Sequence, residues 1–146
     1  MLQEILTELF ERDLTKLKSE INSYEDESKL WMTEKGINNS AGNLCMHLTG
    51  NLRHFIGAIL GNKGYARNRS HEFTVKNVPK EKLISEIDIT LKEVTGTLKL
   101  LSDNDLIKNF PVDVFKRKMT TAYFLTHLAT HLNYHLGQIN YHRRMI

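Results

Sequence analysis

Apolar residues recur along the chain at the spacing of one face of an α-helix, and they do so in four separate segments. The predicted helices cover about residues 2–24, 39–61, 79–101 and 120–146. In each segment, apolar positions three and four residues apart form one stripe, as in a helix that buries one face. We expect the four stripes to share one core, which predicts an all-α fold, a four-helix bundle.

Signals for helix ends accompany this pattern. Asn39 or Ser40 can cap the second helix by accepting an unpaired backbone N–H, and Gly61 suits its end. Pro79 suits the first turn of the third helix. Residues 62–78 form a connection longer than a helical hairpin needs, so we expect a long crossover between the second and third helices.

The connection between the third and fourth helices, residues 105–118, has a different character. Pro111 does not fit inside a smooth helix, and two valines alternate around Asp113 as strand residues do. We therefore expect a short extended excursion there.

Composition narrows the class of protein. The 146 residues are 40% hydrophobic and 25% charged, which predicts a single globular domain over residues 1–146. The net charge of +3 is spread among acidic and basic residues, unlike the basic face of a nucleic-acid binder. No apolar run approaches the ~20 residues of a bilayer span, and the N-terminus does not resemble a signal peptide. We expect a cytoplasmic protein with no nucleic-acid or membrane partner. The one cysteine, Cys45, excludes an internal disulfide and is interpreted as a small packed residue.

The fourth predicted helix carries four of the seven histidines: His127, His131, His135 and His142. At ~100° per residue, His127 and His135 lie about 40° on either side of His131, and His142 lies about 20° away. The same arithmetic places this stripe beside the apolar face of the helix. Part of the row should therefore turn toward the interior.

Two histidines four residues apart on a helix can bind the same metal ion. His131 and His135 form such a pair, and His47 in the second helix, between Leu44 and Leu48, can supply a third ligand. A three-His site leaves positions open for water and substrate, as in catalytic zinc sites, and suits Zn, Ni, Cu and Fe alike. The same spacing also occurs where helix histidines are only surface or hydrogen-bonded core residues.

The remaining histidines are predicted to have other roles. We place His127 and His54 at the rim of the site or behind its ligands. We expect His142 and His71 to be solvated.

The helix start S40-A-G-N-L44 before His47, with H131-L-N-Y-H-L-G-Q138 near the C-terminus, resembles the DinB/YfiT superfamily of proposed metalloenzymes. The resemblance extends over the whole chain and implies a divalent metal on His47, His131 and His135. We expect Zn or Ni ahead of Mn or Fe. The resemblance also implies a homodimer, and close approach of the fourth helix to its neighbour at Gly137.

The resemblance implies thiol chemistry, in which the metal lowers the pKa of a low-molecular-weight thiol and so favours the nucleophilic thiolate. The same site can instead activate water for hydrolysis. The expected function is a metal-dependent enzyme, a thiol S-transferase or a hydrolase acting on a small molecule. The alternative is a non-catalytic metal-binding or partner-binding bundle.

Acidic residues are absent from segments 40–60 and 120–146, so a general base must come from elsewhere. The candidates are Glu72, Asp103, Asp105, Asp113, Tyr123, His54 and His127. Arg67 and Arg69 in the long connection can recognise a carboxylate of a substrate. Alternatively, this loop lies on the surface with an ion pair to Glu72.

Overall fold

The computed structural model describes residues 1–146 and is all-α, as the apolar pattern predicts. Its α-helices are α1 (Leu2–Asn22), α2 (Ala41–Leu52), α3 (Arg69–Thr74), α4 (Lys80–Leu98), α5 (Asp103–Ile107) and α6 (Thr121–Met145). A 3-10 helix, η1 (Glu27–Trp31), follows α1, and a π-helix, η2 (Arg53–Leu60), continues α2. There is no strand.

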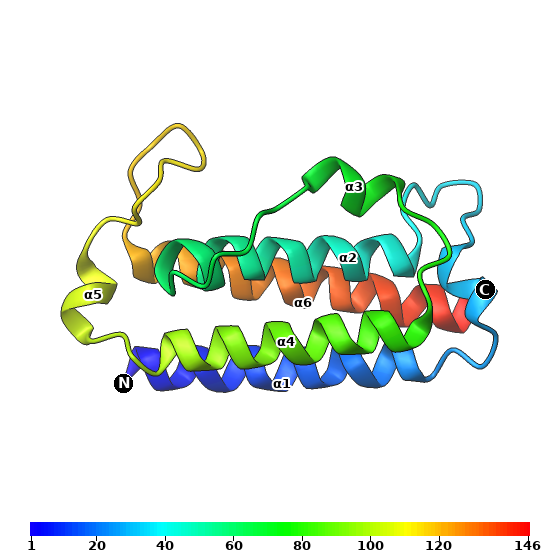
Figure 1. The fold of residues 1–146 in the computed structure, drawn as a ribbon, viewed down its shortest axis with the longest axis horizontal. Coiled ribbons are helices and arrows are strands. Elements are labelled where there is room, and N and C mark those ends of the chain that lie inside the picture. The colour runs from blue at the N-terminus through cyan, green and yellow to red at the C-terminus, as the bar shows by residue number, and fades with distance from the viewer.

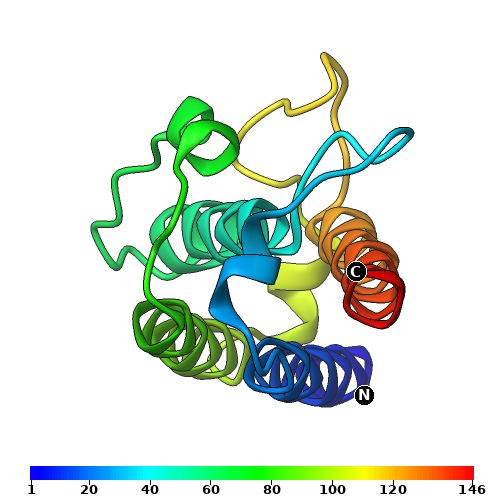
Figure 2. The same cartoon turned by 90° about the vertical axis from the view of Figure 1, so that its right-hand side faces the viewer.

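Four long helical segments lie side by side along the molecule (Figure 1). α1 and α6 run in one direction, and α2 and α4 run in the other (Figure 1). Seen end-on, α1 and α2 occupy opposite corners, each between α4 and α6 (Figure 2). Because α2 and α4 are parallel, the chain returns along the molecule through the predicted long connection. That connection contains α3, which the apolar pattern did not predict and which packs on the outside of α2.

Twenty-seven buried apolar residues form one core cluster between these segments. In α1 the predicted stripe is buried from Leu6 onward except for Leu9, which is partly buried, whereas Leu2 and Ile5 are exposed. Those two residues lie in the first turn, at one end of the molecule (Figure 1). Burial of each large apolar side chain contributes roughly 1.5–3 kcal/mol, so the central turns of the helices carry most of the stability.

The predicted ends of α2 and its continuation are confirmed. The Ser40 hydroxyl accepts a hydrogen bond from the Asn43 backbone N–H at 3.2 Å. Gly61 ends η2, and a Cβ at this position would collide with the Thr97 side chain of α4. The glycine therefore permits close contact between η2 and α4.

Two predictions about local structure were wrong. The second helix is π-helical rather than α-helical over η2. Segment 105–118 holds no strand: α5 occupies its start, and Asn109 and Thr120 form only an isolated bridge. The reason for α5 is a capping box, in which Ser102 and Asp105 each accept a backbone hydrogen bond from the other. None of the helices combines the length and apolar character that crossing a bilayer requires.

Cys45 is fully buried, as its interpretation as a packed residue requires. Burial, with a smaller effect of Glu86, raises the pKa of its thiol to about 12. Since the thiolate is the reactive form, we expect a thiol reagent such as DTNB not to modify the folded protein at mildly alkaline pH. The guanidinium-denatured chain should release one equivalent of chromophore. Rapid modification of the folded chain would show that the side chain is accessible.

Candidate metal centre

The structure brings the three predicted ligands together across the contact between α2 and α6. His47 comes from α2, and His131 and His135 come from successive turns of α6. One potential ligand atom from each residue lies within 4.8 Å of the others. The Nε2 atoms of His47 and His131 are 3.2 Å apart, and the ring centroids of His131 and His135 are 4.6 Å apart. This spacing can accommodate one ion.

Neighbouring acceptors determine which ring nitrogen carries the proton in two of the three histidines. The Nδ1 of His47 lies 3.1 Å from Oε1 of Glu72 and donates to it, because an ionised carboxylate only accepts. The Nδ1 of His135 likewise donates to Oε1 of Gln138 at 2.7 Å. In the neutral form of each ring this leaves Nε2 unprotonated, which is the arrangement seen in metal-binding histidines.

His131 is the one of the three whose Nδ1 is buried without a hydrogen-bond partner. Burial, together with the nearby His135 and His47, lowers its pKa to about 4. Burial also lowers the pKa of His135. If the Nδ1 of His131 carries the proton, two lone pairs face each other across the 3.2 Å between His47 and His131. A cation relieves that repulsion, so neutral imidazoles at this spacing fit a divalent ion.

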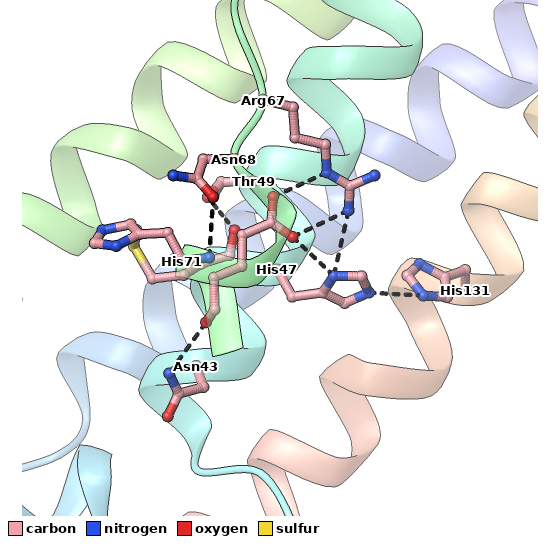
Figure 3. A network of polar contacts seen from close by, with 9 residues as sticks. Asn43, His47, Thr49, Arg67, Asn68, His71 and His131 are labelled. Atoms are coloured by element: carbon pink, nitrogen blue, oxygen red, sulfur yellow. Dashed lines mark hydrogen bonds and ion pairs between the residues drawn. The ribbon is translucent and has the colours of Figure 1, made fainter. Parts of the chain in front are cut away.

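Glu72 of α3 lies behind His47 and is 2% exposed. Arg67 donates to both of its carboxylate oxygens, from Nε at 2.9 Å and from Nη2 at 3.0 Å. Figure 3 shows His47 between Arg67 on one side and His131 on the other. Burial opposes ionisation of Glu72, but the hydrogen bonds from His47 and Arg67 outweigh it and lower the pKa of this carboxyl group.

The pairing of Arg67 decides between the two predicted roles of the loop. Its guanidinium is bound to Glu72, so the ion-pair alternative is confirmed for this residue. It is a buried pair, however, and not the surface pair that was expected. Arg69 lies over the Phe73 ring, with its guanidinium carbon 5.2 Å from the centroid.

Two residues of α2 hold α3 against His47, and neither was predicted to do so. The Asn43 side-chain amide donates to the backbone carbonyl of Glu72 at 3.0 Å (Figure 3) and to that of Val75 at 2.8 Å. A Cβ at Gly50 would collide with the Glu72 carboxylate. Because both partners lie far along the chain, no local pattern could identify these roles.

The other four histidines lie outside the group of three. His127 lies one turn from His131, with ring centroids 6.3 Å apart, and is outside the group of three. His54 is on η2 against Phe55 and also lies outside the group. His71 is exposed as predicted.

The prediction that His142 is solvated was wrong, because His142 is 4% exposed. Its Nδ1 is 2.7 Å from the Tyr24 hydroxyl, and its Nε2 is 2.8 Å from the Met32 carbonyl oxygen. The segments that follow α1 cover this end of α6. The helical periodicity of α6 could not predict this contact, because it holds no information about segments from elsewhere in the chain.

The role expected of Gly137 was also wrong. A Cβ there would meet no atom within 4 Å, so no neighbouring helix makes a close approach at this position.

The other predicted acid–base groups lie outside the histidine group. Asp105 caps α5 and Asp103 is in the same short helix. Asp113 and Tyr123 are exposed. Glu72 alone among the carboxylates contacts a ligand histidine, and it does so while paired with Arg67.

Comparison with known proteins identifies a family. The family model described as "Protein of unknown function (DUF1572)" matches residues 2–146. No curated protein matches the chain at a significant level.

Proposed function

We propose that the chain, which belongs to the DUF1572 family of proteins of unknown function, binds one divalent metal ion through His47, His131 and His135. The observation that carries this proposal is the hydrogen bonding behind the rings. Glu72 and Gln138 each accept an Nδ1–H, which leaves an unprotonated Nε2 on His47 and on His135. An unprotonated Nε2 on both rings is what a metal ion requires of two imidazole ligands.

We further propose that the four long helices form a four-helix bundle of the DinB/YfiT type, with the α3 connection as its long crossover. The parallel course of α2 and α4 supports this interpretation, because a parallel pair of consecutive long helices requires a crossover (Figure 1). The signature H131-L-N-Y-H-L-G-Q138 supports it independently.

The proposed activity is that of a metal-dependent enzyme on a small molecule, a thiol S-transferase or a hydrolase. The ion, with Zn or Ni preferred, would supply a Lewis acid that lowers the pKa of a thiol or of water. The three neutral imidazoles add no charge, and the charge of Glu72 is matched by that of Arg67. The positive charge of the ion therefore remains uncompensated, which favours a substrate group that ionises to an anion.

The protein groups divide into those that hold the site and those that can exchange protons. Glu72 and Gln138 orient ligand rings. Glu72 is engaged by two donors, so it is not free to accept a proton from a substrate. His127, on the same face of α6 and one turn from His131, is the group we assign as proton acceptor.

The test is metal binding by the untagged wild-type protein, prepared without a nickel column. Protein reconstituted separately with Zn, Ni and Mn and freed of excess metal should retain close to one equivalent of at least one of these ions. With Co in the site, an added simple thiol should change the visible absorption spectrum, because an open position accepts it. Absence of bound metal after all reconstitutions would overturn the proposal. A bound ion with an invariant spectrum would favour a non-catalytic role, in which the ion only joins α2 to α6.

A further inference from the structure

A pocket of about 660 Å³ lies beside His135, between α6 and the loop that follows η1. Its volume falls within the range of about 300–1,000 Å³ that is usual for small-molecule sites. The loop contributes Ile37, Asn38 and Asn39, and α6 contributes Tyr134, Gln138 and Tyr141. The loop and the C-terminal half of α6 lie side by side in the end-on view (Figure 2).

The pocket is lined by residues without a permanent charge. It contains no Asp, Glu, Lys or Arg side chain. Three carboxamides, from Asn38, Asn39 and Gln138, provide the polar groups, and aromatic and aliphatic side chains provide most of the rest. His142 is also at the pocket, but both of its ring nitrogens already have partners. A lining without fixed charge disfavours a charged ligand, since a charged group that the pocket encloses without a partner of opposite charge is costly.

Tyr134 and Tyr141 are large side chains that the fold leaves mostly uncovered. Their exposed fractions are 64% and 63%. The Tyr134 ring contacts the His135 ring, with centroids 5.3 Å apart, and the Arg144 guanidinium carbon lies 5.4 Å from the centroid of the Tyr141 ring. Seven residues apart, the two tyrosines lie within about 20° of one another on α6. Gly137 lies between them on the same face, and a Cβ there would meet nothing. Glycine destabilises a helix interior relative to alanine, and no neighbour in this chain requires its small size. The pocket is open above Gly137 and lined by both tyrosines, which suits a flat ligand.

The pocket is connected to the candidate metal centre through Gln138. The Gln138 Nε2 donates to the Tyr134 hydroxyl at 3.4 Å, and its Oε1 accepts from Nδ1 of His135 at 2.7 Å. A molecule that contacts Tyr134 and Tyr141 is therefore next to Gln138, the residue that orients the His135 ring.

We propose that this pocket binds a neutral, partly aromatic small molecule, with its ring between Tyr134 and Tyr141 and a hydroxyl or thiol group toward His135. The orientation toward His135 rests on the proposed function; the pocket and the class of its ligand do not. The carboxamides supply hydrogen bonds to polar substituents, and Gly137 forms the floor on which the ring lies.

The probe is 2-naphthol, with 2-naphthyl phosphate as its charged counterpart, and binding is measured by calorimetry and ligand-observed NMR. Wild-type protein should bind 2-naphthol, and at least tenfold more tightly than the phosphate when metal-free. Gly137→Leu should weaken 2-naphthol binding at least tenfold, because the new side chain occupies the pocket. Gly96→Leu is the matched control, since Gly96 of α4 also has open space at its Cβ position and is not in the pocket. It should bind like wild type.

If Gly137→Leu does not fold, Tyr141→Ala replaces it and should also weaken binding. Failure of wild type to bind 2-naphthol, or equal binding by Gly137→Leu and wild type, would overturn the proposal. The proposal would also be overturned if Gly137→Leu bound 2-naphthol like wild type but no longer formed a dimer. That result would assign this face to a second copy of the chain.

Metal content separates this proposal from the proposed function. Protein that binds 2-naphthol but no metal would retain the pocket and refute the metal centre. Protein that binds metal but no 2-naphthol would retain the metal centre and refute the proposed pocket ligand.

Discussion

Replacing His131 by alanine is expected to abolish stoichiometric metal binding. His131 is the central residue of the group, with Nε2 at 3.2 Å from that of His47 and its ring 4.6 Å from that of His135. Its loss leaves two imidazoles, one from each helix, and removes one of only three protein ligands that a catalytic site of this type has. We expect bound metal to fall from close to one equivalent to background after gel filtration, and His135→Ala to behave in the same way.

The control is His71→Ala, which removes an exposed histidine from α3 and should leave metal content unchanged. Each variant is measured by elemental analysis beside a circular dichroism spectrum, so that loss of metal is separated from loss of fold. Retention of a full equivalent by His131→Ala would mean that the ion lies elsewhere. Loss in both His131→Ala and His71→Ala would point to nonspecific binding.

Glu72→Ala is expected to lower the free energy of unfolding of the metal-free protein by about 3–5 kcal/mol, because it leaves the charge of Arg67, whose side chain is 11% exposed, without its partner. The same change removes the acceptor that holds Nδ1 of His47. Loss of such a partner usually weakens metal affinity about 10–100-fold. Unlike His131→Ala, this variant should still bind metal at saturating concentration.

Urea unfolding and metal titration measure the two effects separately. Glu25→Ala, an exposed acid with no ion-pair partner within 4 Å, should change the unfolding free energy by no more than about 0.5 kcal/mol. Glu72→Gln keeps the shape of the side chain and one acceptor oxygen. Its loss of unfolding free energy should therefore lie between those of Glu72→Ala and Glu25→Ala. A loss below about 1 kcal/mol for Glu72→Ala would show that Arg67 reaches water once its partner is gone.

The all-α class and several helix boundaries follow from local chemistry and were predictable. Apolar stripes of helical period require one buried face, and Ser40 and Gly61 act on backbone groups within a few residues of themselves. The pairing of His131 with His135 was predictable for the same reason, since one turn of α6 places both on one side. His47 was inferred as their partner from its position on an apolar face and from a resemblance, and the structure places it beside them.

The sequence alone thus determined which residues share a helix face, because helical geometry relates positions three and four apart. The tertiary structure decided which faces meet, and with them the pairing of Glu72 with His47, the burial of His142 and the open space at Gly137. Each of these depends on a segment far along the chain. Such contacts arise from packing of the whole core, and the pattern within a single helix holds no information about them.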